Sequence, residues 1–136
     1  MKCFDQSKLV SSCSTTEDSV IADKTKDKID WCMLPPLVRP YEGGQLPIKR
    51  AEKKCQQLES LALAVVKLIK ERPLSKNLRI VDFCSGGGHL AILLAYLMPH
   101  LEVYLVENKP ESLERALNRV QQLQLKNCRF FQGKTI

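Results

Sequence analysis

Apolar residues recur every three or four positions between residues 48 and 72, which is the spacing of one face of a helix. Pro73 cannot continue a helix, and we therefore expect this helix to end just before it. The pattern predicts an apolar stripe that consists of Ala51, Cys55, Leu58, Ala62, Val65 and Ile69.

After Pro73, short apolar runs alternate with helical patterns. Residues 78–83, 102–106 and 128–131 are predicted strands, and residues 88–97 and 110–123 are predicted helices. The order is thus helix and then β-α-β-α-β with short connections, and right-handed crossovers would make the strands parallel, with helices covering them. This predicts an α/β fold, a partial Rossmann-like three-layer sandwich that lacks the later strands of the full sheet. The last predicted helix has one apolar face with Leu113, Ala116, Leu117, Val120 and Leu123.

The first third of the chain has a different character. Residues 1–30 are rich in Ser, Thr, Asp and Lys without periodicity, which predicts a disordered tail or linker. Residues 31–47 hold four of the seven prolines and predict an extended lead-in whose Trp31, Leu34 and Leu37 pack on the domain. Residues 48–136 would then be the amino-terminal half of a folded domain.

Composition narrows the class of protein. The net charge of +6 over 136 residues favours anionic partners, whereas 6% aromatic residues argue against a base-stacking surface. Six cysteines without a CxxC pair and only two histidines predict neither a metal site nor a disulfide framework. The longest apolar run, at residues 90–98, is too short to cross a membrane, and no signal peptide is visible. We therefore predict a reduced, cytoplasmic protein.

A glycine cluster follows the first predicted strand in the stretch "VDFCSGGGHL". Glycine permits positive φ and close approach of a ligand, and the following helix presents free amide groups. Glu107 closes the second strand 19 residues beyond Gly88 and is placed to accept hydrogen bonds from the two hydroxyls of a ribose. Together these elements predict a cofactor that contains adenosine.

Two such cofactors fit the residues. Gly86, Gly88 and Ala91 match the G-x-G-x-x-A pattern of NAD-binding domains. Asp82 at the end of the first strand would repel a pyrophosphate but attract an ammonium or a sulfonium, which favours S-adenosylmethionine. The long helix before the first strand also argues against a dinucleotide domain, and an NAD-binding Rossmann fragment remains the second alternative.

Three stretches resemble the Rossmann-like class I methyltransferases that use S-adenosylmethionine: "KRAEKKCQQLESLALAVV", "VDFCSGGGHLAILLA" and "LVENKPESLERA". The resemblance implies that Glu107 binds the ribose and that Asn108 lies near the adenine. Cys84 stands where many of these enzymes carry their first glycine. The cofactor turn that the resemblance implies consists of Asp82, Cys84, Ser85, Gly86 and Gly88.

The resemblance also implies four further strands, one of which carries the catalytic motif, and the pattern contains none of them. No catalytic residue can be named, so we expect a methyltransferase-like half-domain that binds the cofactor without catalysing transfer. An unpaired strand edge would call for a protein partner that covers it. The main alternative is a non-catalytic RNA- or protein-interaction module that keeps the methyltransferase shape.

Three reactive side chains have ordinary interpretations. Cys84 and Cys128 could be redox-active, but packing as small buried residues is the favoured interpretation. His89 lacks a carboxylate partner in the pattern and is interpreted as structural rather than catalytic.

A basic cluster occupies the first turns of the long helix, where the helix dipole disfavours cations. The favoured interpretation is that these cations simply face the solvent. The alternative is that they bind RNA or another anionic substrate beside the cofactor. The cluster consists of Lys49, Arg50, Lys53 and Lys54.

Overall fold

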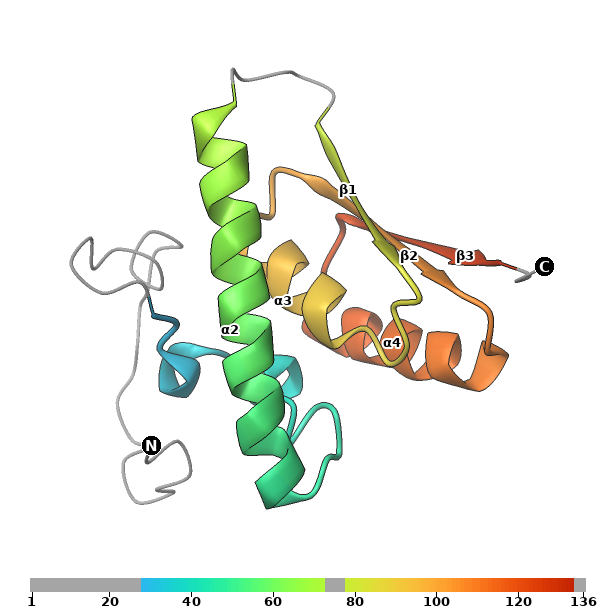
Figure 1. Cartoon of the computed structure of the whole chain (residues 1–136). Coiled ribbons are helices and arrows are strands. Elements are labelled where there is room, and N and C mark those ends of the chain that lie inside the picture. Colours follow the sequence, from blue (N-terminus) through green and yellow to red (C-terminus); the bar gives the residue numbers. More distant parts are fainter. Residues whose placement is uncertain (1–27, 73–77, 134–136) are drawn as a thin grey trace.

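The computed structural model describes residues 28–72 and 78–133 (Figure 1). Two short 3-10 turns come first and are followed by a long helix and then by alternating strands and helices. The elements are η2 (Trp31–Met33), η3 (Pro36–Val38), α2 (Ile48–Glu71), β1 (Arg79–Phe83), α3 (His89–Leu97), β2 (Glu102–Glu107), α4 (Pro110–Leu123) and β3 (Cys128–Gln132).

The three strands form one parallel sheet in the order β1-β2-β3. Asp82 pairs with Leu105, and Leu105 pairs with Phe130, so the carboxyl ends of all three strands lie at one edge. The predicted α/β class with parallel strands is therefore confirmed, and each predicted strand and helix lies within one residue of its observed bounds.

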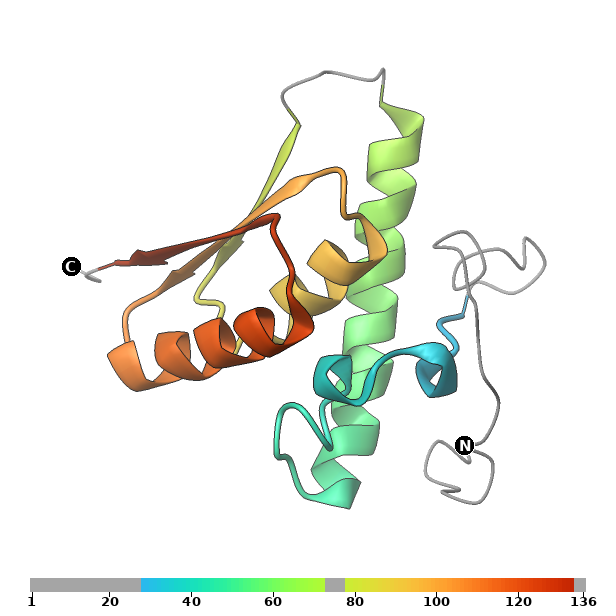
Figure 2. The same cartoon turned by 180° about the vertical axis from the view of Figure 1, so that it is seen from behind.

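Helices α3 and α4 cover one face of the sheet, and α2 packs against the outer side of α3 (Figures 1 and 2). Because α3 lies between the sheet and α2, it is apolar on all sides. The side-chain amide of Asn127 ties the end of α3 to β2, since it donates to the carbonyls of Ala95, Met98 and Leu101 at 3.0, 3.2 and 2.9 Å. The residues of α3 that are at most 1% exposed are Ala91, Ile92, Leu93, Leu94 and Ala95.

The predicted stripe of α2 is right in its first four residues and wrong at its end. After Ala62 the next buried residue is Val66 and not the predicted Val65. Val65 and Ile69 are only partly buried. Alternating steps of three and four residues average 3.5, so the predicted stripe drifts from the face of a straight helix with 3.6 residues per turn.

The apolar face predicted for α4 also differs from the observed one. Leu117 is 36% exposed, whereas Ser112 and Arg119 are buried beside Ala116 and Val120. The reason is that α4 contacts both the sheet and η3, so the buried part of the helix turns towards the lead-in.

The lead-in departs from the predicted extended form because it contains the turns η2 and η3. Trp31 and Leu34 are buried as expected, but Val38 is fully buried and Leu37 only partly. Residues 1–27 of the predicted disordered tail lie outside the described residues. Ile29 does not belong to a tail, since it is buried and its amide donates to Glu59 Oε1 at 3.0 Å.

No described helix covers the second face of the sheet. Val81, Phe83 and Phe131 are 46%, 73% and 51% exposed there. Tyr104 stacks on Phe131 with ring centroids 5.6 Å apart and shields part of this face. Within residues 28–72 and 78–133, β1 and β3 each have one free edge, so the protein partner expected at the edge stays a prediction.

Candidate functional site

The glycine turn connects β1 to α3 at the carboxyl edge of the sheet. The Ser85 amide donates to the Val106 carbonyl at 3.1 Å, and the Gly88 amide donates to the Ser85 carbonyl at 2.9 Å. Cys84, Gly86 and Gly88 have φ of 60°, 56° and 79°, in the left-handed region that favours glycine. The turn is thus anchored to β2 and strongly bent.

The two left-handed glycines serve different purposes. A Cβ on Gly88 would lie 2.9 Å from Ala116 Cβ and 3.1 Å from Leu105 Cδ2, so Gly88 lets the turn pack on α4 and β2. A Cβ on Gly86 would meet no atom within 4 Å. The side of the turn at Gly86 is therefore open, and a ligand can approach the backbone there.

Glu107 binds the turn as well as the start of α4. Its Oε2 accepts from the Gly86 amide at 2.6 Å, and its Oε1 accepts from the amides of Asn108 and Lys109 at 2.8 and 2.9 Å. These bonds, first that from Lys109 and next that from Gly86, lower the pKa of Glu107, which keeps the carboxylate charged. Since a carboxylate oxygen has two lone pairs, one acceptor position remains, on Oε2. That position can accept from one ribose hydroxyl, and the two bonds expected from the sequence stay a prediction.

Asp82 faces the helical layer. Burial raises the pKa of its carboxyl, while a hydrogen bond from the Ala91 amide and the charge of Lys54 act in the opposite direction. The carboxylate therefore supports the amino-terminal turn of α3 as well as contributing negative charge to the site.

The other residues that the sequence singled out lie in the turn or directly after Glu107, except for Cys128, which begins β3 at the opposite edge of the sheet. Cys84 is exposed, so the expectation that it packs as a small buried residue is wrong. Cys128 is buried, and burial raises the pKa of its thiol to about 11, which suppresses the reactive thiolate. The Ser85 hydroxyl is buried without a hydrogen-bond partner among the described residues. Asn108 is exposed directly after Glu107.

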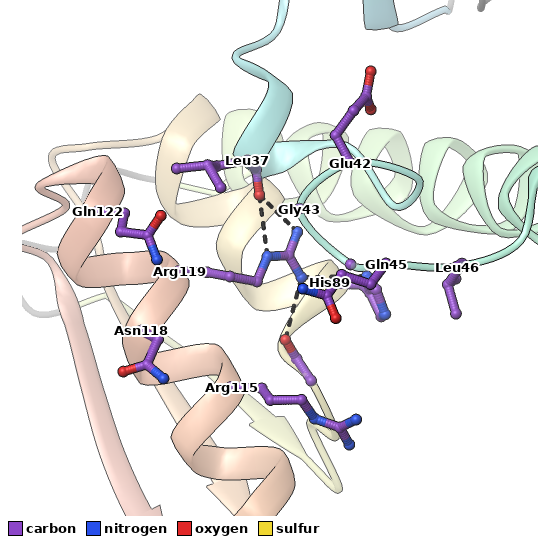
Figure 3. Close-up of a pocket in the computed structure, with 12 residues that line it drawn as sticks. Leu37, Glu42, Gly43, Gln45, Leu46, His89, Arg115, Asn118, Arg119 and Gln122 are labelled. Atoms are coloured by element: carbon purple, nitrogen blue, oxygen red, sulfur yellow. Dashed lines mark hydrogen bonds between the residues drawn. The ribbon is translucent and has the colours of Figure 1, made fainter.

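A hollow of about 460 Å³ lies beside the turn, between α4 and the loop that joins η3 to α2 (Figure 3). Its lining is mostly polar and combines three parts of the chain that are distant in sequence. The lining residues include Gly43, Gly44, Gly87, His89, Arg115 and Arg119.

Arg119 is the central side chain of this hollow, and the sequence pattern did not point to it. It is 5% exposed and donates to the carbonyl of Leu37 at 2.8 Å (Figure 3). It also donates to the carbonyls of Val38 at 3.3 Å and Gly87 at 3.2 Å. Burial lowers its pKa to about 10, so it stays charged at neutral pH. Its position between Ala116 and Val120, on the apolar face of α4, was the available signal. Arg119 holds the lead-in, α4 and the glycine turn together.

His89 lies between Arg119 and α2. Burial, and next the charges of Arg119, Lys54 and Arg115, lower the pKa of His89 to about 4. The ring is thus neutral at pH 7, and its Nδ1 faces Arg119 Nη1 at 3.4 Å, so Nδ1 accepts and Nε2 carries the proton.

We expect protonation of His89 to destabilise the fold below neutral pH. The imidazole is neutral in the fold down to about pH 4 but gains a proton near pH 6.5 when unfolded. The stabilisation by neutral His89 is therefore full above pH 6.5 and is lost as the pH falls towards 4, at a cost of about 3 kcal/mol. Urea unfolding at several pH values measures this loss.

The variant His89→Gln is the control for this pH dependence. Glutamine can accept from Arg119 without titrating, while the shifted carboxyls of Asp82 and Glu107 remain in both proteins. The wild type should therefore lose stability relative to the variant between pH 6.5 and 4, and the difference between them should stay constant below pH 4. An identical decline from pH 6.5 to 4 in both would show that His89 is not its source.

Residues 28–72 and 78–133 include no helix with the length and the apolar character of a membrane span. They also contain no group of three or more His, Cys, Asp and Glu side chains that could hold a metal ion.

Comparison with known proteins places the site in a family context. Residues 74–135 match a family model described as a methyltransferase domain. The chain is 47% identical over 104 residues to the glutathione S-transferase C-terminal domain-containing protein homolog of Drosophila melanogaster, a match that covers 76% of this chain and 17% of that protein. It is 45% identical over 105 residues to the glutathione S-transferase C-terminal domain-containing protein of Homo sapiens, covering 77% of this chain and 16% of the relative.

A bacterial protein matches a shorter part. The release factor glutamine methyltransferase of Coxiella burnetii is 31% identical over 67 residues, which cover 49% of this chain and 24% of that protein. The chain thus spans about one sixth of the length of the two animal relatives.

Proposed function

The chain is homologous to the glutathione S-transferase C-terminal domain-containing proteins over a segment that includes a methyltransferase domain, and we propose that it binds S-adenosylmethionine at the turn after β1. The match to the methyltransferase family confirms the resemblance expected from the sequence. Binding of the cofactor itself is the proposal, and the geometry of the turn supports it.

The observation that carries the proposal is the open side of the turn at Gly86. The backbone there is free of neighbours within 4 Å of a hypothetical Cβ, directly beside the Glu107 carboxylate. The Ser85 hydroxyl in the same turn is buried without a partner in the part of the chain that the structure describes, and a missing hydrogen bond of this kind costs about 1–3 kcal/mol. A nucleoside ligand that supplies polar groups at this place suits the residues present.

Different residues of the turn and of β2 would bind different parts of the cofactor. Oε2 of Glu107 has an acceptor position left for a ribose hydroxyl, and Asn108 follows it towards the expected place of the adenine. Asp82 contributes negative charge at the end of β1, which favours an ammonium or sulfonium over a pyrophosphate. When bound, the cofactor would supply a methyl group on sulfur, and this chain's own residues would hold and orient it.

Glu107→Gln is expected to weaken S-adenosylmethionine binding by about tenfold to a hundredfold, the equivalent of about 1–3 kcal/mol for a hydrogen bond to a charged group. Glutamine keeps one oxygen acceptor but loses the charge. Isothermal titration calorimetry with S-adenosylmethionine, its demethylated product and NAD measures the effect and the preference.

Glu111→Gln is the matched control, because Glu111 is exposed in the first turn of α4. Its affinity should equal that of the unchanged protein. Preference for NAD would reverse the argument from Asp82, and absence of any nucleoside binding would refute the cofactor proposal. An equal affinity of both glutamine variants would remove Glu107 from the site.

A cytoplasmic location is part of the same proposal. Cys32, Cys84 and Cys128 are free thiols, which suits a reducing compartment. The expected lack of catalysis by this chain stays a prediction, which a methyl-transfer assay on the full-length relatives and on this chain would test.

A further inference from the structure

Two hollows meet at His89 and Leu46. The first is the hollow of about 460 Å³ between α4 and the loop before α2. The second, of about 550 Å³, lies along the first turns of α2 and is lined by Leu46, Arg50, Lys53, Lys54, Gln57 and His89. Because both are lined by His89 and Leu46, they form two halves of one depression, which we call the basic groove.

Cationic side chains outnumber acidic ones in the lining of the basic groove, and the charge of one of them, Lys54, also acts on the carboxyl of Asp82. Among the described residues, Glu42 is the one acidic residue of the lining, and it is paired with Arg39 at 3.1 Å. Within residues 28–72 and 78–133, none of the groove's cationic side chains forms an ion pair. These side chains are Arg50, Lys53 and Lys54 from α2 and Arg115 and Arg119 from α4.

The cations of the two helices converge on the same place. The charges of Arg119, Lys54 and Arg115 all act on the ring of His89, so residues from α2 and from α4 lie close to it. The sequence indicated only the cluster on α2. Packing of α2 against α3 and of the lead-in against α4 adds Arg115 and Arg119 to it.

The cations differ in what they can contact. Arg119 donates its hydrogen bonds to the carbonyls of Leu37, Val38 and Gly87. It therefore attracts an anion through its charge and does not contact the anion directly. Arg115 donates to Ser112 Oγ at 3.2 Å and Lys54 to Gln57 Oε1 at 3.2 Å, neutral partners that an anion can replace. Arg50 and Lys53 add two further exposed cations.

We propose that the basic groove binds the phosphate backbone of a single polynucleotide strand, with RNA as the expected form. Hollows of about 460 and 550 Å³ lie in the range of small-ligand pockets, so each suits a sugar-phosphate unit rather than a flat membrane surface. Among the described residues, no Phe, Tyr or Trp lines either hollow, so recognition goes through phosphates and not through stacked bases.

The place of the groove links it to the glycine turn. Gly87 and His89 line the first hollow and lie directly next to Gly88. A strand bound in the groove would thus pass beside the turn as a candidate methyl acceptor. That role rests on the proposed cofactor function, whereas binding of the strand does not.

Fluorescence anisotropy of a labelled RNA of roughly 12 nucleotides tests the proposal, with no cofactor present. Arg50→Gln and Arg115→Gln each remove one contact, one from each hollow. Each should lower the slope of log affinity against log salt by about 0.7, and the double variant should lower it by about 1.4. The double variant should also bind about tenfold more weakly at fixed salt.

The control is Lys70→Gln combined with Arg72→Gln, which removes the same charge at the far end of α2 (Figure 1). About 20 residues of helix separate it from Arg50, or about 30 Å. Its affinity should change by less than about twofold. An equal loss in the control would show a diffuse charge effect and overturn the proposal, as would a loss for only one of the two groove variants.

Competitors distinguish the sources of negative charge. Unlabelled RNA should displace the probe, DNA of the same length should do so comparably or less well, and a polyglutamate peptide should not. Displacement by polyglutamate at equal charge would assign the groove to acidic proteins instead. Because Glu107→Gln should leave RNA affinity unchanged, failure of this proposal and failure of cofactor binding can be told apart.

Discussion

Arg119→Ala is expected to lower the free energy of unfolding by about 3–5 kcal/mol, the range for removing one member of a buried polar network. The substitution leaves the carbonyls of Leu37, Val38 and Gly87 without their donor in a buried place. It also releases the lead-in from α4. Urea unfolding measures the loss, and the fluorescence of Trp31, the single tryptophan, reports on the lead-in directly.

Arg115→Ala is the matched control on the same helix. Arg115 is exposed one turn before Arg119, so its loss should cost less than about 0.5 kcal/mol. Arg119→Lys should fall between the two, because an ammonium keeps the charge but cannot span carbonyls on both sides of the hollow. If Arg119→Ala unfolded at the same urea concentration as Arg115→Ala, the bonds that join the lead-in to α4 would add nothing to stability.

Gly88→Ala is expected to destabilise the fold by about 2–5 kcal/mol, the sum of backbone strain and overpacking. Its φ of 79° is unfavourable for alanine, and the added Cβ would lie 2.9 Å from Ala116 Cβ and 3.2 Å from Ile92 Cδ1. Since α3, α4 and β2 are all packed around this point, the neighbours cannot move apart without losing core contacts. Thermal and urea unfolding both report this change.

Substitutions at the two neighbouring glycines serve as controls. Gly87→Ala would place its Cβ 3.9 Å from His89 Nε2, an ordinary contact, and should leave stability nearly unchanged. Gly86→Ala meets no neighbour and should cost only the strain of its φ, about 1–2 kcal/mol, while it obstructs the open side of the turn. Equal losses at positions 86 and 88 would contradict the separate roles of these glycines.

The elements of the fold could be predicted from the sequence because each depends on local periodicity. The strand bounds at Arg79–Phe83 and the helix bounds at Pro110–Leu123 agree with the pattern to within a residue. Misassignments arose where a helix contacts more than one neighbour, as at Leu117, which the pattern places in the core and the structure leaves exposed. Which side of an amphipathic helix is buried depends on everything that packs against it.

The candidate site was partly predictable for the same reason. A glycine turn after one strand and an acid after the next must lie together, because parallel strands end at one edge. The pattern did not show that Glu107 already accepts three backbone amides, since these bonds depend on the exact path of the turn.

The sequence by itself determined the alternation of strands and helices, the place of the turn and the companion acid Glu107. The tertiary structure alone decided that the lead-in folds against α4, where Arg119 donates to Leu37, 82 residues away. It also decided that the cations of α2 and α4 share one groove. The physical reason is that periodicity follows from backbone geometry within a few residues, whereas these contacts arise from packing between segments whose separation no local pattern encodes.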